Sequence, residues 1–177
     1  MERRILGAVL AGGQSRRFGS DKALAMLDGA TLLDRAVATL AALCSEVVVV
    51  GRDVAPVPVV PDHPAPGMGP LGGIAGALRH ANSGGFDAVL SLPVDAVGFD
   101  AAGLSALVPG PSCCSAQPVI GLWPVTVMPV VEAILAGEGR HSLRQLADAA
   151  GARLVALPAV TGNINTPADL AACEAGS

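Results

Sequence analysis

ILGAVLAGGQSRRFGSDK, residues 5–22, joins an aliphatic run to a loop rich in glycine and positive charge. A short aliphatic run bounded by glycines predicts a buried strand over residues 5–10. Gly12 and Gly13 then let the backbone approach a ligand closely, because neither carries a Cβ. Successive N–H groups in such a turn form a concavity that binds anions. Three cations follow within ten residues: Arg16, Arg17 and Lys22. The loop is therefore predicted to bind the phosphates of a nucleoside triphosphate.

An ordinary surface turn is the alternative interpretation of the same residues, since a Gly-Gly pair followed by charge is common in such turns. The GxxxxGK[ST] spacing of a P-loop is absent, as is the GxGxxG fingerprint of dinucleotide-binding proteins. The position directly after a predicted first strand, together with the cations, favours phosphate binding.

The composition is that of a folded protein with one core. With 177 residues, of which 51% are apolar and 15% charged, the chain is predicted to form one domain over residues 1–177. A net charge of −4, with no basic stripe beyond the first loop, argues against nucleic-acid binding. No signal peptide or membrane span is recognised, so a cytoplasmic protein without membrane contact is expected.

The four cysteines do not form a metal or disulfide pattern. They include no CxxC pair, and two of them are adjacent: Cys44, Cys113, Cys114 and Cys173. They are interpreted as small apolar side chains rather than as a zinc site or a disulfide framework.

Strand and helix patterns alternate along the chain. Strands are predicted over 5–10, 47–50, 57–60, 88–92 and 153–157, with a short extended segment over 23–27 and one or two strands within 115–123. Helices are predicted over 32–44, 71–81, 101–108, 127–136, 143–150 and 167–172, with Thr31, Ser142 and Thr166 as caps. This alternation predicts a three-layer α/β/α sandwich with a Rossmann-like, mostly parallel sheet.

Ligands of such sheets bind outside the carboxyl ends of the strands. That rule brings four loops together, at residues 11–22, 51–53, 62–71 and 93–95. The glycines within 72–76 make a poor helix and suggest close packing there.

Several polar residues of these loops, and of a late loop, are candidates for the chemistry. Asp95 follows a strand, and its carboxylate can hold Mg²⁺ beside phosphates or serve as an ordinary loop acid. Asp62 can accept hydrogen bonds from a base or ribose, or simply be solvated. Asn163 and Asn165, two residues apart in an extended loop, point the same way, either to bind a polar ligand or to form Asx turns.

These segments together resemble a known family. LAGGQSRRFGSDK, residues 10–22, is similar to the LAGGxSxRMGxxK signature of the MobA-like nucleotidyltransferases, with Phe18 in place of Met. GPLGGI, residues 69–74, resembles the family's GPLxGI segment, and Asp95 stands where the family has the Asp of its CDxP motif. GLWP, residues 121–124, and NINTPADL, residues 163–170, resemble motifs of the molybdenum cofactor guanylyltransferase subgroup.

The resemblance implies the nucleotide-diphospho-sugar transferase type of fold and a reaction. GTP and Mo-molybdopterin would give Mo-molybdopterin guanine dinucleotide and pyrophosphate, in molybdenum cofactor biosynthesis. Transient contacts with proteins that deliver molybdopterin or accept the product are expected. The implied roles, all by resemblance, are nucleotide binding by Leu10, Ala11, Gly12, Gly13, Asp62 and Asp95, phosphate binding by Arg17 and Lys22, Mg²⁺ binding by Asp95, and molybdopterin binding by Asn163 and Asn165. Arg17, Lys22 and Asp95 are the implied catalytic residues.

Two departures from the family pattern bear on the site. The CDxP motif is replaced by Val94-Asp95-Ala96-Val97, so the loop after Asp95 is expected to differ in shape. Val50-Gly51 stands where relatives carry an Asn, so any contact of that side chain is lost or replaced. Three alternatives remain open: a cytidylyl transfer to molybdopterin, a transfer to another phosphate acceptor such as a sugar or cobinamide phosphate, and a degenerate nucleotide-binding regulator.

Overall fold

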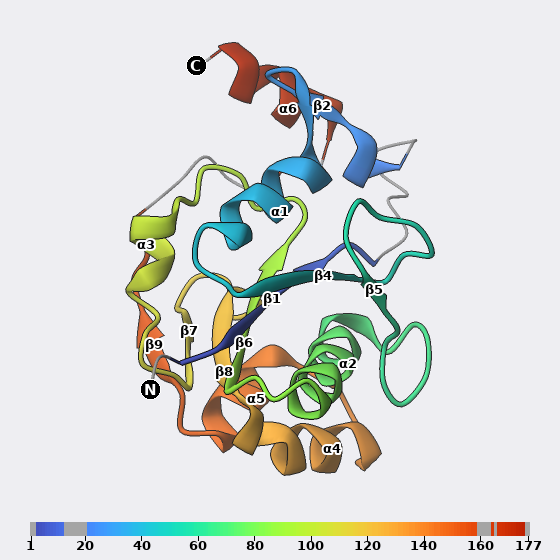
Figure 1. Cartoon of the computed structure of the whole chain (residues 1–177), viewed down its shortest axis with the longest axis vertical. Helices are drawn as coiled ribbons and strands as arrows, with labels where there is room; N and C mark the ends of the chain where they lie inside the picture. Colours follow the sequence, from blue (N-terminus) through green and yellow to red (C-terminus); the bar gives the residue numbers. More distant parts are fainter. Residues whose placement is uncertain (1–2, 13–20, 159–163, 165, 176–177) are drawn as a thin grey trace.

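A twisted seven-stranded sheet runs through the middle of the molecule (Figure 1). The computed structural model describes residues 3–12, 21–158, 164 and 166–175. The strand order is β5-β4-β1-β6-β8-β7-β9. The strands are β1 (Ile5–Leu10), β4 (Glu46–Val50), β5 (Val59–Val60), β6 (Ala88–Pro93), β7 (Ser112–Cys114), β8 (Gly121–Pro124) and β9 (Arg153–Val155). Every strand of this sheet except β8 runs in the same direction.

Helices cover both faces of the sheet, which confirms the predicted three-layer α/β/α architecture (Figure 1). One layer contains α1 (Leu32–Ala41), α3 (Ala101–Ser105) and α6 (Pro167–Ala175), with the small hairpin of β2 (Met26–Leu27) and β3 (Ala30–Thr31). The other contains α2 (Gly69–Ser83), α4 (Met128–Ala136) and α5 (Leu143–Ala149). Two 3₁₀ turns complete the described elements: η1 (Lys22–Leu24) and η2 (Val125–Val127).

The central strands are apolar on both faces because both faces are covered. In β1, Leu6 and Ala8 face the core under α2, whereas Val9 faces the core under α1. In the neighbouring β4, Val48 faces the core under α2 and Val49 faces the core under α1. Burial of each such side chain stabilises the fold by about 1.5–3 kcal/mol relative to exposure. The uniform aliphatic runs are therefore explained by a parallel sheet buried on two sides.

All three predicted helix caps are present as hydrogen bonds, and at the start of α6 the Thr166 Oγ1 accepts from the Asp169 N–H at 3.2 Å. Thr31 Oγ1 accepts from the Asp34 N–H at 3.0 Å, and Ser142 Oγ accepts from the Gln145 N–H at 3.1 Å. No helix in the described part of the chain is long and apolar enough to cross a membrane.

Some boundaries differ from those predicted, for local reasons. Residues 22–24 form the turn η1 instead of an extended segment, because the Asp21 carboxylate caps that turn. Strand β5 is reduced to Val59–Val60, since the prolines before it cannot donate to a ladder. Strand β7 begins at Ser112, earlier than predicted, and α3 ends at Ser105.

Candidate functional site

The first loop leaves the sheet between the ends of β4 and β6. The Ala11 N–H donates to the Val50 carbonyl at 2.9 Å, and the Val94 N–H donates to the Leu10 carbonyl at 3.0 Å. These bonds extend the parallel ladders by one residue past the end of β1. The start of the loop is thereby fixed at the carboxyl ends of three neighbouring strands, where α/β sheets bind ligands.

Gly12 packs directly on the backbone of Gly51. A Cβ built on Gly51 would lie 2.4 Å from the Gly12 Cα, and Gly51 has a φ of +85°. Both the space and the backbone conformation therefore require glycine at position 51. The Asn expected there from the family pattern is replaced by a backbone contact that supports the first loop.

Lys22 and Asp95, which are 73 residues apart in sequence, form an ion pair at this edge. The Lys22 Nζ lies 2.7 Å from Asp95 Oδ2, and the side chains are only 14% and 18% exposed. Lys22 is placed by η1, while Asp95 lies in the turn after β6 in which the Ala96 N–H donates to the Pro93 carbonyl. The structure thus brings the end of the first loop over strand β6.

The pair of Asp21 and Arg52 is a feature that sequence reasoning missed. Arg52 donates two hydrogen bonds to the Asp21 carboxylate, from Nη1 at 2.8 Å and from Nη2 at 2.7 Å. The guanidinium holds the pKa of the Asp21 carboxyl below its ordinary value, and the same pairing raises the pKa of Arg52. Spacing along the chain gives no signal for this contact, because the two residues meet only through the pairing of β1 with β4.

Asp62 follows β5 and Asp95 follows β6, so the two residues lie on opposite sides of β1 in the strand order. Asp62 Oδ2 accepts a hydrogen bond from the Gly67 N–H at 3.1 Å, which closes the Pro/Gly-rich loop. Helix α2 approaches this segment so closely that a Cβ on Gly76 would lie 2.0 Å from the Pro61 carbonyl oxygen. The close packing predicted for the glycines of this helix is therefore confirmed, and its partner is the backbone before Asp62.

Five candidate residues singled out in the sequence lie outside the described residues: Gly13, Arg16, Arg17, Asn163 and Asn165. Ile164 is described and fully buried, and its N–H donates to the Asp95 carbonyl at 3.3 Å. Ile164 therefore lies beside the turn that carries Asp95. Within the described ranges, no group of three or more His, Cys, Asp or Glu side chains is arranged to hold a metal ion.

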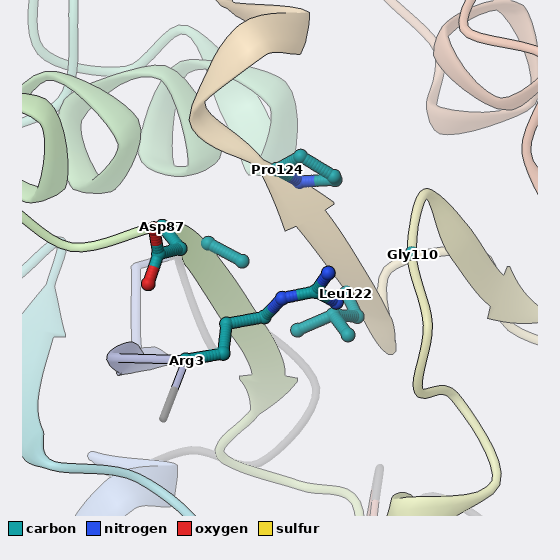
Figure 2. A pocket seen from close by; sticks show the side chains of 6 residues that line it. Arg3, Asp87, Gly110, Leu122 and Pro124 are labelled. Carbon is teal, nitrogen blue, oxygen red and sulfur yellow. The ribbon is translucent and has the colours of Figure 1, made fainter. Parts of the chain in front are cut away.

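A cavity of about 220 Å³ lies at the opposite end of the strands (Figure 2). Arg3, which precedes β1, extends across it toward Leu122 and Pro124, and Asp87 stands at the start of β6. Asp87 Oδ2 already accepts from the Arg4 N–H at 2.8 Å. This cavity is at the amino end of β6, so it is separate from the edge that carries Asp95.

Solved structures of other proteins share this fold. It superposes on a molybdopterin-guanine dinucleotide biosynthesis protein A from Archaeoglobus fulgidus with a TM-score of 0.73 and 22% identity, covering 96% of this chain and 97% of that one. A nucleotidyl transferase from Methanothermobacter superposes with a TM-score of 0.74 and 21% identity, covering 99% and 98% of the two chains.

Residues 7–157 match the MobA-like NTP transferase domain, and the chain belongs to this family of nucleotidyltransferases. A molybdenum cofactor guanylyltransferase from Acidiphilium cryptum is 37% identical, with 97% of this chain and 95% of the relative aligned. A protein of the same name from Rhodobacter capsulatus is 35% identical over the same shares of the two chains. The family predicted from the first loop is thus confirmed.

Proposed function

We propose that this protein transfers GMP from GTP to Mo-molybdopterin, forming Mo-molybdopterin guanine dinucleotide and pyrophosphate. The names of the relatives support the choice of substrates. The observation that carries the proposal is the ion pair of Lys22 and Asp95, which places a cation for phosphates and a carboxylate for a metal 2.7 Å apart at the ligand-binding edge.

The nucleotide side of the site is built on the first loop and Asp62. Leu10, Ala11 and Gly12 lie where the backbone leaves the sheet, so we assign nucleotide contacts to this backbone and to Gly13. Lys22, with Arg17 of the same loop, binds the phosphates as a positive charge. Asp62, on the opposite side of β1 from Asp95, binds the nucleoside, and its hydrogen bond from Gly67 orients the carboxylate for that contact.

Mg²⁺ fits the residues present. It is usually held by one or two carboxylates together with the phosphates of the substrate, and it does not need a cage made only of protein ligands. A single carboxylate, Asp95, therefore suffices as the protein ligand. When bound, the metal neutralises charge on the phosphates. Asp95 would hold the ion, and the Lys22 ammonium, whose Nζ lies 2.7 Å from Asp95 Oδ2, would supply a second positive charge beside it.

The reaction requires positioning and charge neutralisation more than covalent chemistry. An oxygen of the terminal phosphate of molybdopterin forms a bond to the α-phosphorus of GTP. The bond from that phosphorus to the bridging oxygen of the β-phosphate breaks, and pyrophosphate leaves with the electron pair. Lys22 and Arg17 stabilise the negative charge that moves onto the leaving group.

The acceptor is assigned to the side of Asp95 away from Asp62. Asn163 and Asn165 flank Ile164, whose N–H is hydrogen-bonded to the Asp95 carbonyl. We therefore assign molybdopterin binding to these two asparagines. Transient partners that supply molybdopterin or receive the product, and a cytoplasmic location where GTP is available, belong to the same proposal.

Pyrophosphate release tests the proposal. The wild-type protein, Mg²⁺ and Mo-molybdopterin are mixed with GTP or CTP, and the dinucleotide product is identified by mass spectrometry. GTP is expected to support release, and the variants Lys22→Ala and Asp95→Asn are expected to lose at least about tenfold of kcat/KM, since each removes a charge-assisted contact.

Glu46→Gln is the matched control, because it breaks a 3.6 Å ion pair with Arg4 at the opposite end of the strands. It should leave transfer unchanged. Release with CTP but not with GTP would reassign the enzyme to cytidylyl transfer. Tight GTP binding without turnover would instead identify a nucleotide-binding regulator.

A further inference from the structure

Asp21 and Lys22 form ion pairs in opposite directions across the end of β1. Asp21 contacts Arg52, in the loop after β4, whereas Lys22 contacts Asp95, in the turn after β6. Strands β4 and β6 are the two neighbours of β1 in the sheet. The end of the first loop is therefore held from both sides.

The contact with Arg52 fixes the backbone that carries Lys22. Asp21 Oδ1 accepts from the Ala23 N–H at 3.2 Å and so caps η1, the turn to which Lys22 belongs. The same carboxylate accepts hydrogen bonds from both terminal nitrogens of Arg52. One side chain thus defines the turn and attaches it to the neighbouring loop.

Contacts of the side chain and of the preceding residue hold Arg52 in place. Its side chain is 18% exposed, and its Nε donates to the Val54 carbonyl at 3.4 Å. The residue before it, Gly51, packs on Gly12 with no room for a Cβ. The backbone that carries Arg52 is therefore fixed against the start of the first loop.

We propose that Arg52 is a positioning residue for triphosphate binding, acting through Asp21 to keep Lys22 within reach of both Asp95 and the phosphates. This inference rests on the phosphate role of Lys22 in the proposed function. A lysine side chain loses much rotamer freedom when it is held in one place. A fixed backbone reduces the conformational entropy that is lost when the Lys22 side chain moves from Asp95 to a phosphate.

A direct phosphate contact by Arg52 is the competing explanation, and the two make opposite predictions for Asp21. If Arg52 bound phosphate itself, Asp21→Asn would release the guanidinium and strengthen triphosphate binding. If Arg52 acts through Asp21, then Asp21→Asn and Arg52→Gln weaken binding by similar factors, and the double variant is no weaker than either single one.

The experiment measures the dissociation constant of GTP with Mg²⁺, and its KM and kcat, for wild type, Arg52→Gln, Asp21→Asn and the double variant. Each single variant is expected to raise Kd and KM by about threefold to fivefold, the upper range for an exposed pair with bidentate geometry. The kcat at saturating GTP should fall by a smaller factor than KM rises, because Lys22 itself is still present in each variant.

Arg35→Gln is the matched control. Arg35 forms a 3.5 Å ion pair with Asp28, and neither residue takes part in the two ion pairs of Asp21 and Lys22. It should change thermal stability by a similar amount without changing Kd, which separates positioning from general destabilisation.

The inference is overturned if Arg52→Gln leaves Kd unchanged, if the effects of the two single variants multiply, or if Asp21→Asn strengthens binding. CTP is tested in parallel, because its triphosphate is the same. Binding of CTP alone would refute the guanylyl assignment while still testing Arg52. A wild-type protein that binds neither nucleotide would refute both proposals.

Discussion

Gly76→Ala is expected to destabilise the protein, although the same change in an exposed helix interior usually stabilises. Alanine has a helix propensity better than that of glycine by about 0.8–1 kcal/mol. In α2, however, the new Cβ would lie 2.0 Å from the Pro61 carbonyl oxygen, 3.1 Å from the Pro61 carbonyl carbon and 3.4 Å from the Asp62 Cα. The nearest atoms belong to the backbone, so rotation of a side chain cannot relieve the contact.

The magnitude follows from the balance of these two effects. Forcing an extra methyl group into a packed interior costs about 1–3 kcal/mol, and the gain in helix propensity offsets about 1 kcal/mol of it. The 2.0 Å contact with a backbone atom places Gly76→Ala in the upper part of that range, at about 2–3 kcal/mol, so we expect a net loss of about 1–2 kcal/mol in the free energy of unfolding. For a protein of this size that corresponds to a fall in Tm of about 3–6 °C. Because the helix pushes on the segment before Asp62, the KM for GTP should rise as well.

Gly73→Ala provides the comparison, since both glycines lie in α2. Its Cβ would meet only side-chain atoms, with Leu10 Cδ2 at 3.2 Å and Val50 Cγ1 at 3.4 Å. Thermal denaturation followed by circular dichroism should therefore show Gly73→Ala near wild type and Gly76→Ala clearly below it. A Gly76→Ala protein as stable as wild type, with unchanged KM, would refute the close packing of α2 on Pro61.

Three further outcomes are expected. Gln117→Met should raise the free energy of unfolding in urea by about 1 kcal/mol, because Gln117 Oε1 is buried without a hydrogen-bond partner; a fall would contradict this. Burial raises the pKa of Cys44 to about 12, so its thiol stays protonated at neutral pH, and mass spectrometry should show alkylation by iodoacetamide only after unfolding. Arg52→Gln should raise the pKa of the Asp21 carboxyl toward its ordinary value in an NMR titration, since the guanidinium holds it low; an unchanged pKa would mean that the pair is absent in solution.

The layers of the fold were predictable because they depend on hydrophobic periodicity, which each segment carries within itself. The valine run of β4 and the spacing of leucines in α1 needed no knowledge of the rest of the chain. The direction of β8 was not predictable in this way. It runs against β6 with Leu90 opposite Leu122, a pairing that depends on the hairpin with β7 and not on the apolar pattern of β8.

The candidate site was likewise predictable only in part. The binding edge followed from the rule that α/β sheets bind ligands at the carboxyl ends of their strands, and Lys22 and Asp95 were named from the family motif. The structure brings these two residues into contact. The ion pair of Asp21 with Arg52 depends on how two loops pack after β1 and β4 have paired. No local pattern marks it, and only the fold shows that Arg52, the second residue after β4, is paired with a carboxylate.

The altered surroundings of Asp95 are explained by packing in place of the missing Cys and Pro. Val94, Ala96 and Val97 are all buried in the core under α1, so the turn is held by apolar side chains on both sides of the carboxylate. The backbone of Asp95 is bonded to Ile164, and its side chain is bonded to Lys22. A residue held by its backbone, its neighbours and its carboxylate needs no proline to restrict it. The departure from the family motif therefore changes how Asp95 is supported, while the carboxylate keeps its place at the edge where phosphates and metal are proposed to bind.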